Sequence, residues 1–199
     1  MSEGNVTDYD SRRYALVNRW DESHLKRINR LTHFGPDDRV LEVGCGQGHL
    51  TRALADQGVD ILGIDANPNA SEIAGNGLVK YMKAEALEFE DGSFDTVISV
   101  HALEHIPDLD GALSEIARVL KPGGQAVFIY PAEPVMGLYA IPTSVILHGT
   151  PFKARQVHCH KLWPSKMRRL AQPFGLEEAA HEFSLIKSPQ FSSVFTKTP

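Results

Sequence analysis

The fold is decided by the stretch Val40-Leu41-Glu42-Val43-Gly44-Cys45-Gly46-Gln47-Gly48-His49-Leu50. In it an apolar strand runs into three alternate glycines, and a segment with helical apolar spacing follows at once. Glycine tolerates positive φ and has no Cβ atom, so a ligand can lie against the bare backbone of this loop. The helix that follows presents unpaired N–H groups and the positive end of its dipole to an anionic ligand group. The loop is therefore predicted to hold a cofactor that contains a nucleoside.

The composition is that of a globular chain with one folded domain. The chain has 199 residues, 42% hydrophobic and 23% charged, which is enough for the core of one α/β domain. Its formal net charge of -5 argues against a nucleic-acid partner. Cys45 and Cys159 lie far apart in the sequence and give no disulfide framework. The N-terminus has no apolar signal-like region, and the most apolar region, residues 135–147, is too short to cross a bilayer. We therefore expect a cytoplasmic protein without a membrane span.

Strands and helices are expected to alternate along the chain, which predicts an open, mostly parallel α/β sheet. The run from Phe94 to Val100 is almost continuously apolar, as in a strand covered on both faces. Helical spacing from Asp108 to Leu120 ends at Lys121-Pro122-Gly123-Gly124. The expected strands are 39–43, 59–65, 78–82, 94–100, 125–130 and two runs within 176–197, and the expected helices are 11–31, 50–57, 67–74, 108–120 and 164–174.

A single domain over residues 1–199 is expected, and it divides into three parts. Residues 1–38 are predicted to form an N-terminal helical cap and residues 39–130 the cofactor-binding half. Residues 131–199 are predicted to form the lid and the substrate-side half, because prolines interrupt an apolar segment there.

The glycine loop alone does not identify the cofactor. The dinucleotide fingerprint is G-x-G-x-x-G, whereas this loop reads G-x-G-x-G and His49 follows Gly48. Asp65, at the end of the second expected strand, fits a carboxylate that accepts hydrogen bonds from both ribose hydroxyls. That role serves NAD and S-adenosylmethionine equally.

Four motifs in order along the chain carry a family resemblance. They are Glu42-Val43-Gly44-Cys45-Gly46-Gln47-Gly48, Gly63-Ile64-Asp65, Asp91-Gly92-Ser93-Phe94-Asp95-Thr96-Val97-Ile98-Ser99 and Leu120-Lys121-Pro122-Gly123-Gly124. The series resembles class I S-adenosylmethionine-dependent methyltransferases, especially the type 11-like small-molecule group. The resemblance implies a seven-stranded Rossmann-like sheet of order 3-2-1-4-5-7-6 with helices on both faces. It also implies that the cofactor S-adenosylmethionine binds at the carboxyl ends of strands 1 and 4.

The resemblance implies a set of cofactor-binding residues. The glycine loop would face the methionine part, Asp65 would hold the ribose, and Ala66 and Asn67 would border the adenine or ribose. The acidic residue that contacts the adenine amino group would fall near Glu85-Ala86, although the commonest family spacing puts Lys83 at that position. We favour Glu85, because a lysine cannot accept a hydrogen bond from an amino group. The full set is Glu42, Gly44, Cys45, Gly46, Gly48, Asp65, Ala66, Asn67, Glu85, Ala86, Val100 and His101.

The implied reaction is transfer of the sulfonium methyl group to a small-molecule acceptor of lipid-like or anionic character. The apolar lid favours an acceptor with a hydrophobic part, and a basic run within residues 153–169 favours an anionic acceptor. Much of the catalysis would come from holding the reacting atoms in line. An oxygen or nitrogen acceptor with a proton needs a base. His101 and His105 are the first candidates for this catalytic role, followed by His148, His158 and Tyr130.

Two other functions stay open at this point: a nicotinamide-dependent oxidoreductase and a non-catalytic S-adenosylmethionine-binding regulatory protein. No metal is expected, because the two histidines of His158-Cys159-His160 have no CxxC or carboxylate partner nearby in the sequence. Asp95 is expected to pair with backbone or a lysine. Glu104 and His105 are expected either to cap and pack or to face the substrate.

Overall fold

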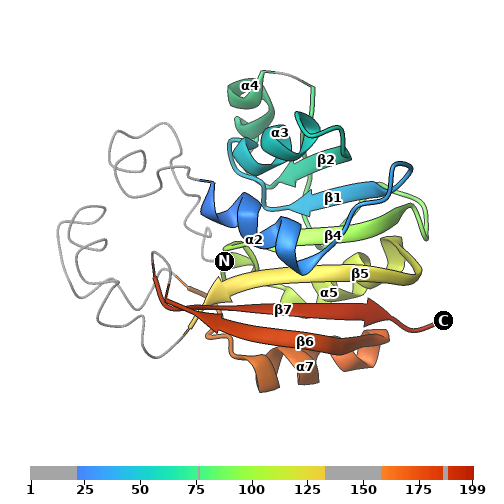
Figure 1. Ribbon diagram of the computed structural model, residues 1–199, viewed down its shortest axis with the longest axis vertical. Coiled ribbons are helices and arrows are strands. Elements are labelled where there is room, and N and C mark those ends of the chain that lie inside the picture. The colour runs from blue at the N-terminus through green and yellow to red at the C-terminus, as the bar shows by residue number, and fades with distance from the viewer. Residues whose placement is uncertain (1–21, 76, 133–157, 186–187) are drawn as a thin grey trace.

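A seven-stranded sheet of order β3-β2-β1-β4-β5-β7-β6 forms the centre of the molecule (Figure 1), as the family resemblance implied. The structure is a computed structural model that describes residues 22–75, 77–132, 158–185 and 188–199. All neighbouring strands are parallel except at β7, which runs antiparallel to both β5 and β6. The strands are β1 (Arg39–Val43), β2 (Asp60–Asp65), β3 (Val79–Tyr81), β4 (Phe94–Val100), β5 (Leu120–Pro131), β6 (Leu176–Ser184) and β7 (Gln190–Lys197).

Helices cover both faces of the sheet, with α2 and α3 on one face and α5 and α7 on the other (Figure 1). The Asp108 side chain caps α5 by accepting a hydrogen bond from the Gly111 N–H at 3.0 Å. The helices are α2 (Ser23–Leu31), α3 (His49–Ala55), α4 (Ala70–Ala74), α5 (Leu109–Val119) and α7 (Pro164–Ala171), with short 3-10 turns η1 (Leu103–His105) and η3 (Gln172–Phe174). Within the described residues, none of these helices is long and apolar enough to cross a membrane.

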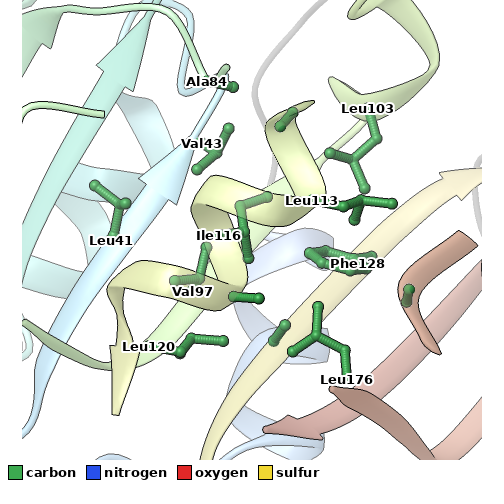
Figure 2. Packing of buried hydrophobic residues seen from close by; sticks show 14 of the residues in the cluster. Leu41, Val43, Ala84, Val97, Leu103, Leu113, Ile116, Leu120, Phe128 and Leu176 are labelled. Atoms are coloured by element: carbon green, nitrogen blue, oxygen red, sulfur yellow. The ribbon is translucent and has the colours of Figure 1, made fainter. Parts of the chain in front are cut away.

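Alternate side chains of the central strands pack into two separate cores. Val40 and Ile98 contribute to the core beneath α2 and α3. Leu41, Val97 and Phe128 point to the opposite face, where they pack beneath α5 (Figure 2). This period of two within strands that are apolar on both faces is the pattern of a parallel sheet covered on both sides.

The predicted bounds of β1 and β4 are confirmed, whereas β5 is longer than predicted. It begins at Leu120 rather than Gln125, since Leu120 pairs with Phe94 before the register shifts. The Pro-Gly-Gly segment is therefore an irregularity within one ladder and not a turn between two elements. The predicted pairing of Asp95 is confirmed, because its carboxylate accepts from Lys121 Nζ at 2.7 Å. The predicted helix over 11–31 is described only from residue 22, and the predicted lid lies largely in residues 133–157, outside the described part.

Candidate cofactor and acceptor site

The three glycines of the loop after β1 all adopt positive φ, but they do so for different reasons. Gly44, Gly46 and Gly48 have φ of 74°, 53° and 70°. A Cβ on Gly44 would lie 2.2 Å from Ala102 Cβ, and one on Gly48 would lie 2.6 Å from Val79 Cγ2. A Cβ on Gly46 would meet no atom within 4 Å. Gly44 and Gly48 thus allow other parts of the protein to pack closely against the loop. Of the three loop glycines, only Gly46 has open space where a Cβ would lie.

Asp65 joins the end of β2 to this loop. Its Oδ2 accepts a hydrogen bond from Gly46 N at 2.8 Å, and its Oδ1 accepts one from Asn67 N at 2.8 Å. The Gly44 and Cys45 N–H groups both donate to the Ile64 carbonyl, at 2.8 and 3.0 Å. The carboxylate therefore lies beside the open backbone of Gly46, at the carboxyl ends of β1 and β2.

Glu42 is a buried residue of β1 that makes a hydrogen bond to α3. Its Oε2 accepts a hydrogen bond from the Thr51 hydroxyl at 2.5 Å. Burial raises the pKa of Glu42 to about 7, against the lowering effect of the Thr51 hydrogen bond and with a further increase from the charge of Asp65. The neighbouring Cys45 thiol has its pKa raised by burial and by these two carboxylates, which does not suit a nucleophile.

On the adenine side, the segment after β3 is fixed by Arg118 of α5. Its guanidinium donates to the carbonyls of Leu87 and Phe89 at 2.9 and 2.7 Å and to the carboxylates of Glu115 and Asp91 at 2.8 Å. This anchor lies immediately after the predicted adenine-contacting residues. Of those, Glu85 is half-buried, whereas Ala86 and the alternative residue, Lys83, are exposed.

His101 follows β4 and is the one non-glycine residue with positive φ, at 53°, in the part of the chain that the structure describes. Its N–H donates to the Ile129 carbonyl at 2.8 Å. Its Nε2 lies 2.9 Å from Gln190 Oε1, and its Nδ1 lies 3.5 Å from Glu104 Oε1. Both ring nitrogens therefore face protein oxygens, which holds the imidazole at the end of β4.

Glu104 is the buried centre of a group of histidines. Its side chain is 2% exposed, and its Oε1 lies 4.0 Å from His105 Nε2. Burial works to raise the pKa of Glu104, but hydrogen bonding to His101 and the charges of His101 and His105 bring it below its usual value. His158 completes the group, with its ring centroid 5.0 Å from that of His105 in an edge contact.

The structure separates the candidate bases. Val100 and His101 lie at the carboxyl end of β4, and His105 lies one turn further on, with 41% of its side chain exposed. Tyr130 is fully buried, and burial raises its pKa to about 12 against the lowering effect of its Ser193 hydrogen bond, which does not suit a base. His148 lies outside the described residues.

Sequence reasoning missed Gln190 and His24, which both contact His101. The His24 ring meets the His101 ring edge-on at 5.6 Å, and burial together with the charges of His101 and Arg27 lowers the pKa of His24 to about 4. These residues come from opposite ends of the chain, and no motif connects them to β4. Arg118 was also missed, since a lone arginine near a helix end gives no signal for a loop anchor.

The fold and the glycine loop are of the Rossmann-like type that is common among nucleotide-cofactor proteins, and comparisons with known proteins narrow the class. Residues 41–128 match the family described as "Methyltransferase domain". This part of the chain is therefore similar to a methyltransferase domain, and the sheet has the strand order implied by the resemblance to class I S-adenosylmethionine-dependent methyltransferases. The match is to the family that the four sequence motifs resemble, and it supports the predicted enzyme class and the predicted cofactor.

Two curated relatives and one solved structure illustrate the similarity. The chain is 34% identical over 150 residues to the ubiquinone biosynthesis O-methyltransferase of Bordetella avium (strain 197N), covering 70% of this chain and 62% of that protein. It is 40% identical over 116 residues to phosphoethanolamine N-methyltransferase 2 of Caenorhabditis elegans, covering 53% of this chain and 26% of that protein. A SAM-dependent methyltransferase from Archaeoglobus fulgidus has the same fold, with a TM-score of 0.73 at 17% identity, covering 92% and 98% of the two chains. The chain thus spans less than two thirds of either curated relative.

Proposed function

We propose that this chain transfers the methyl group of S-adenosylmethionine to a small-molecule acceptor. The observation that carries the proposal is the pairing of Asp65 with Gly46 at the carboxyl ends of β2 and β1. A buried carboxylate beside open backbone, on the strand next to the point between β1 and β4 where the strand order reverses, suits a nucleoside with a free diol. When bound, the cofactor supplies an electrophilic methyl group. Asp65 and the Gly46 backbone would hold the cofactor, which would supply the methyl group to the acceptor atom.

We assign the cofactor contacts to the residues around the loop. Asp65 holds the ribose hydroxyls and the Gly46 backbone lies against the methionine part, as no Cβ fills the space beside it. Glu85 is favoured over Lys83 for the adenine amino group, because a carboxylate accepts from an amino group and an ammonium does not. Glu42 is assigned a supporting role, because it accepts a hydrogen bond from Thr51 of α3, the helix that follows the loop.

The acceptor site is assigned to the carboxyl end of β4. His101 is held there by Gln190 and Glu104, and we assign it a positioning role because both of its nitrogens face protein oxygens. His105 presents an exposed ring close to the Glu104 carboxylate and is assigned to the acceptor's proton. The names of the two relatives, one an enzyme of ubiquinone biosynthesis and the other a phosphoethanolamine methyltransferase, support an acceptor of lipid-like or anionic character.

Calorimetry tests the cofactor assignment first. S-adenosylmethionine and NADH are titrated in parallel into the purified chain, and we expect saturable binding of S-adenosylmethionine alone. Binding of NADH without S-adenosylmethionine would establish the oxidoreductase alternative.

A methyl-transfer screen over quinols, phenols, amines and lipid acids, read as S-adenosylhomocysteine formed, then tests catalysis. Turnover with one acceptor class supports the proposal. Tight cofactor binding with no turnover on any class would favour the non-catalytic, regulatory alternative.

A further inference from the structure

We propose that Glu104, His105 and His158 form a binding site for a divalent transition-metal ion of the zinc type. The three side chains each offer one ligand atom, and these atoms all lie within 4.8 Å of one another. Two imidazoles and one carboxylate are a donor set that zinc and its neighbours in the first transition row accept. No metal was expected from the sequence, because His158 and His160 have no CxxC or carboxylate partner nearby along the chain. In the folded chain, Glu104 and His105 of η1 lie beside His158.

The Glu104 carboxylate provides the charge that such an ion needs. The residue is 1% exposed, and its Oε2 has no hydrogen-bond partner among the described residues. A buried carboxylate oxygen without a partner is costly, so the site has an unmet demand for a cation or a donor. The other oxygen, Oε1, faces His101 and His105 at 3.5 and 4.0 Å. A divalent ion between Glu104 and the two ligand histidines would supply positive charge to this buried carboxylate.

Hydrogen bonds hold the two segments of the site side by side. The His160 N–H donates to the Glu104 carbonyl at 3.1 Å, and His160 Nε2 lies 2.9 Å from the Ile106 carbonyl oxygen. The Cys159 thiol donates to the His105 carbonyl at 3.6 Å. These contacts fix the residues on either side of the ligand pair. His158 is therefore placed against His105 by the backbone, as a prebuilt site requires.

The site is closed on one side and open on the other. Glu104 is buried, His158 is half-buried and His105 is exposed. Ligand atoms around a tetrahedral zinc ion lie roughly 3.3 Å apart, whereas these lie within 4.8 Å of one another, so side-chain rotation has to close the group by up to about 1.5 Å. Three protein ligands leave a position for water or for an oxygen of a second molecule. An ion bound here occupies His105, which then acts as a ligand and not as a base.

The test measures metal binding directly and does not depend on methyl transfer. Zn²⁺ is titrated calorimetrically into chelator-treated protein, and Co²⁺ is titrated while its visible absorption is recorded. The variants are His158→Ala and His105→Ala, which remove different ligands, and the matched control is the exposed His33→Ala. S-adenosylmethionine binding and the melting temperature show that each variant is folded.

We expect one saturable site in the parent chain and in His33→Ala, with affinity at least tenfold weaker in both ligand variants. Absence of saturable binding in the parent chain overturns the proposal. Equal affinity in His158→Ala and His33→Ala also overturns it, since the ion would then bind elsewhere. Because no acceptor or turnover enters these measurements, failure of the metal site leaves the proposed methyl transfer standing, and the reverse holds too.

Discussion

The Asp65 carboxylate accepts a hydrogen bond from the Gly46 N–H at 2.8 Å, which fixes the glycine loop after β1 against the end of β2. The same carboxylate accepts from Asn67 N at 2.8 Å, so both oxygens are oriented by backbone donors. A carboxylate can accept about four hydrogen bonds, and these two backbone donors use two of them. Asp65 thus shapes the loop and stays able to accept from a ribose.

Replacing Asp65 by alanine is expected to remove cofactor binding. The loss of charge-assisted hydrogen bonds to two hydroxyls is worth about 3 kcal/mol or more, which is roughly a hundredfold or more in affinity. Calorimetry with S-adenosylmethionine measures the effect. The matched control is Asp60→Asn at the opposite end of the same strand, where the side chain is 71% exposed and the affinity should not change. Unaltered affinity in Asp65→Ala would contradict the ribose assignment.

Alanine at Gly44 and at Gly46 is expected to damage different properties. Both substitutions cost about 1 kcal/mol through the left-handed backbone, but at Gly44 the new Cβ also meets Ala102 Cβ at 2.2 Å, which adds about 1–3 kcal/mol. At Gly46 the new Cβ enters open space beside Asp65, so it should weaken S-adenosylmethionine binding at least tenfold with little further loss of stability. Urea unfolding and calorimetry on both variants separate the two effects. Wild-type affinity in Gly46→Ala would show that the ligand does not approach this backbone.

The sequence predicted the parts of the molecule that local chemistry controls. The glycines and the turn residues mark the ends of β1 and β4. Asp65 lies at the end of a neighbouring parallel strand, which the sheet brings beside the loop. The surroundings of His101 were not predictable in this way, because Gln190 reaches it from β7 and His24 from α2. Such contacts depend on how strands and helices pack, and neither hydrophobic period nor motif spacing encodes them.

Removing the Arg118 side chain is expected to loosen the segment between β3 and β4. Arg118→Ala removes hydrogen bonds to the Leu87 and Phe89 carbonyls and an ion pair with Glu115, and it should lower the free energy of unfolding by about 2–3 kcal/mol. It should also speed hydrogen exchange at the Leu87 N–H, which donates to Glu115. The control is Lys26→Ala, whose exposed pair with Glu22 is worth less than about 1 kcal/mol. Equal losses in the two variants would show that Arg118 does not anchor the segment.

Glu42 is expected to make the folded chain less stable as the pH rises. Its pKa is about 7 when folded, against an ordinary value of 4.5, so the native state binds the proton more tightly than the unfolded state does. The stabilisation by the bound proton is complete below pH 4.5 and is lost as the pH rises through 7. Glu42→Gln stays neutral and still accepts from Thr51, so its stability should lack this loss.

Urea unfolding of the parent chain and Glu42→Gln between pH 4.5 and 8 measures the effect. The difference in unfolding free energy should grow in favour of the variant by about 3 kcal/mol over this range, because one pKa unit corresponds to about 1.4 kcal/mol. The exposed Glu88→Gln should follow the parent chain at every pH. A constant difference between parent and Glu42→Gln would mean that Glu42 ionises normally in the folded state, and that the Thr51 hydrogen bond holds a charged carboxylate beneath the glycine loop.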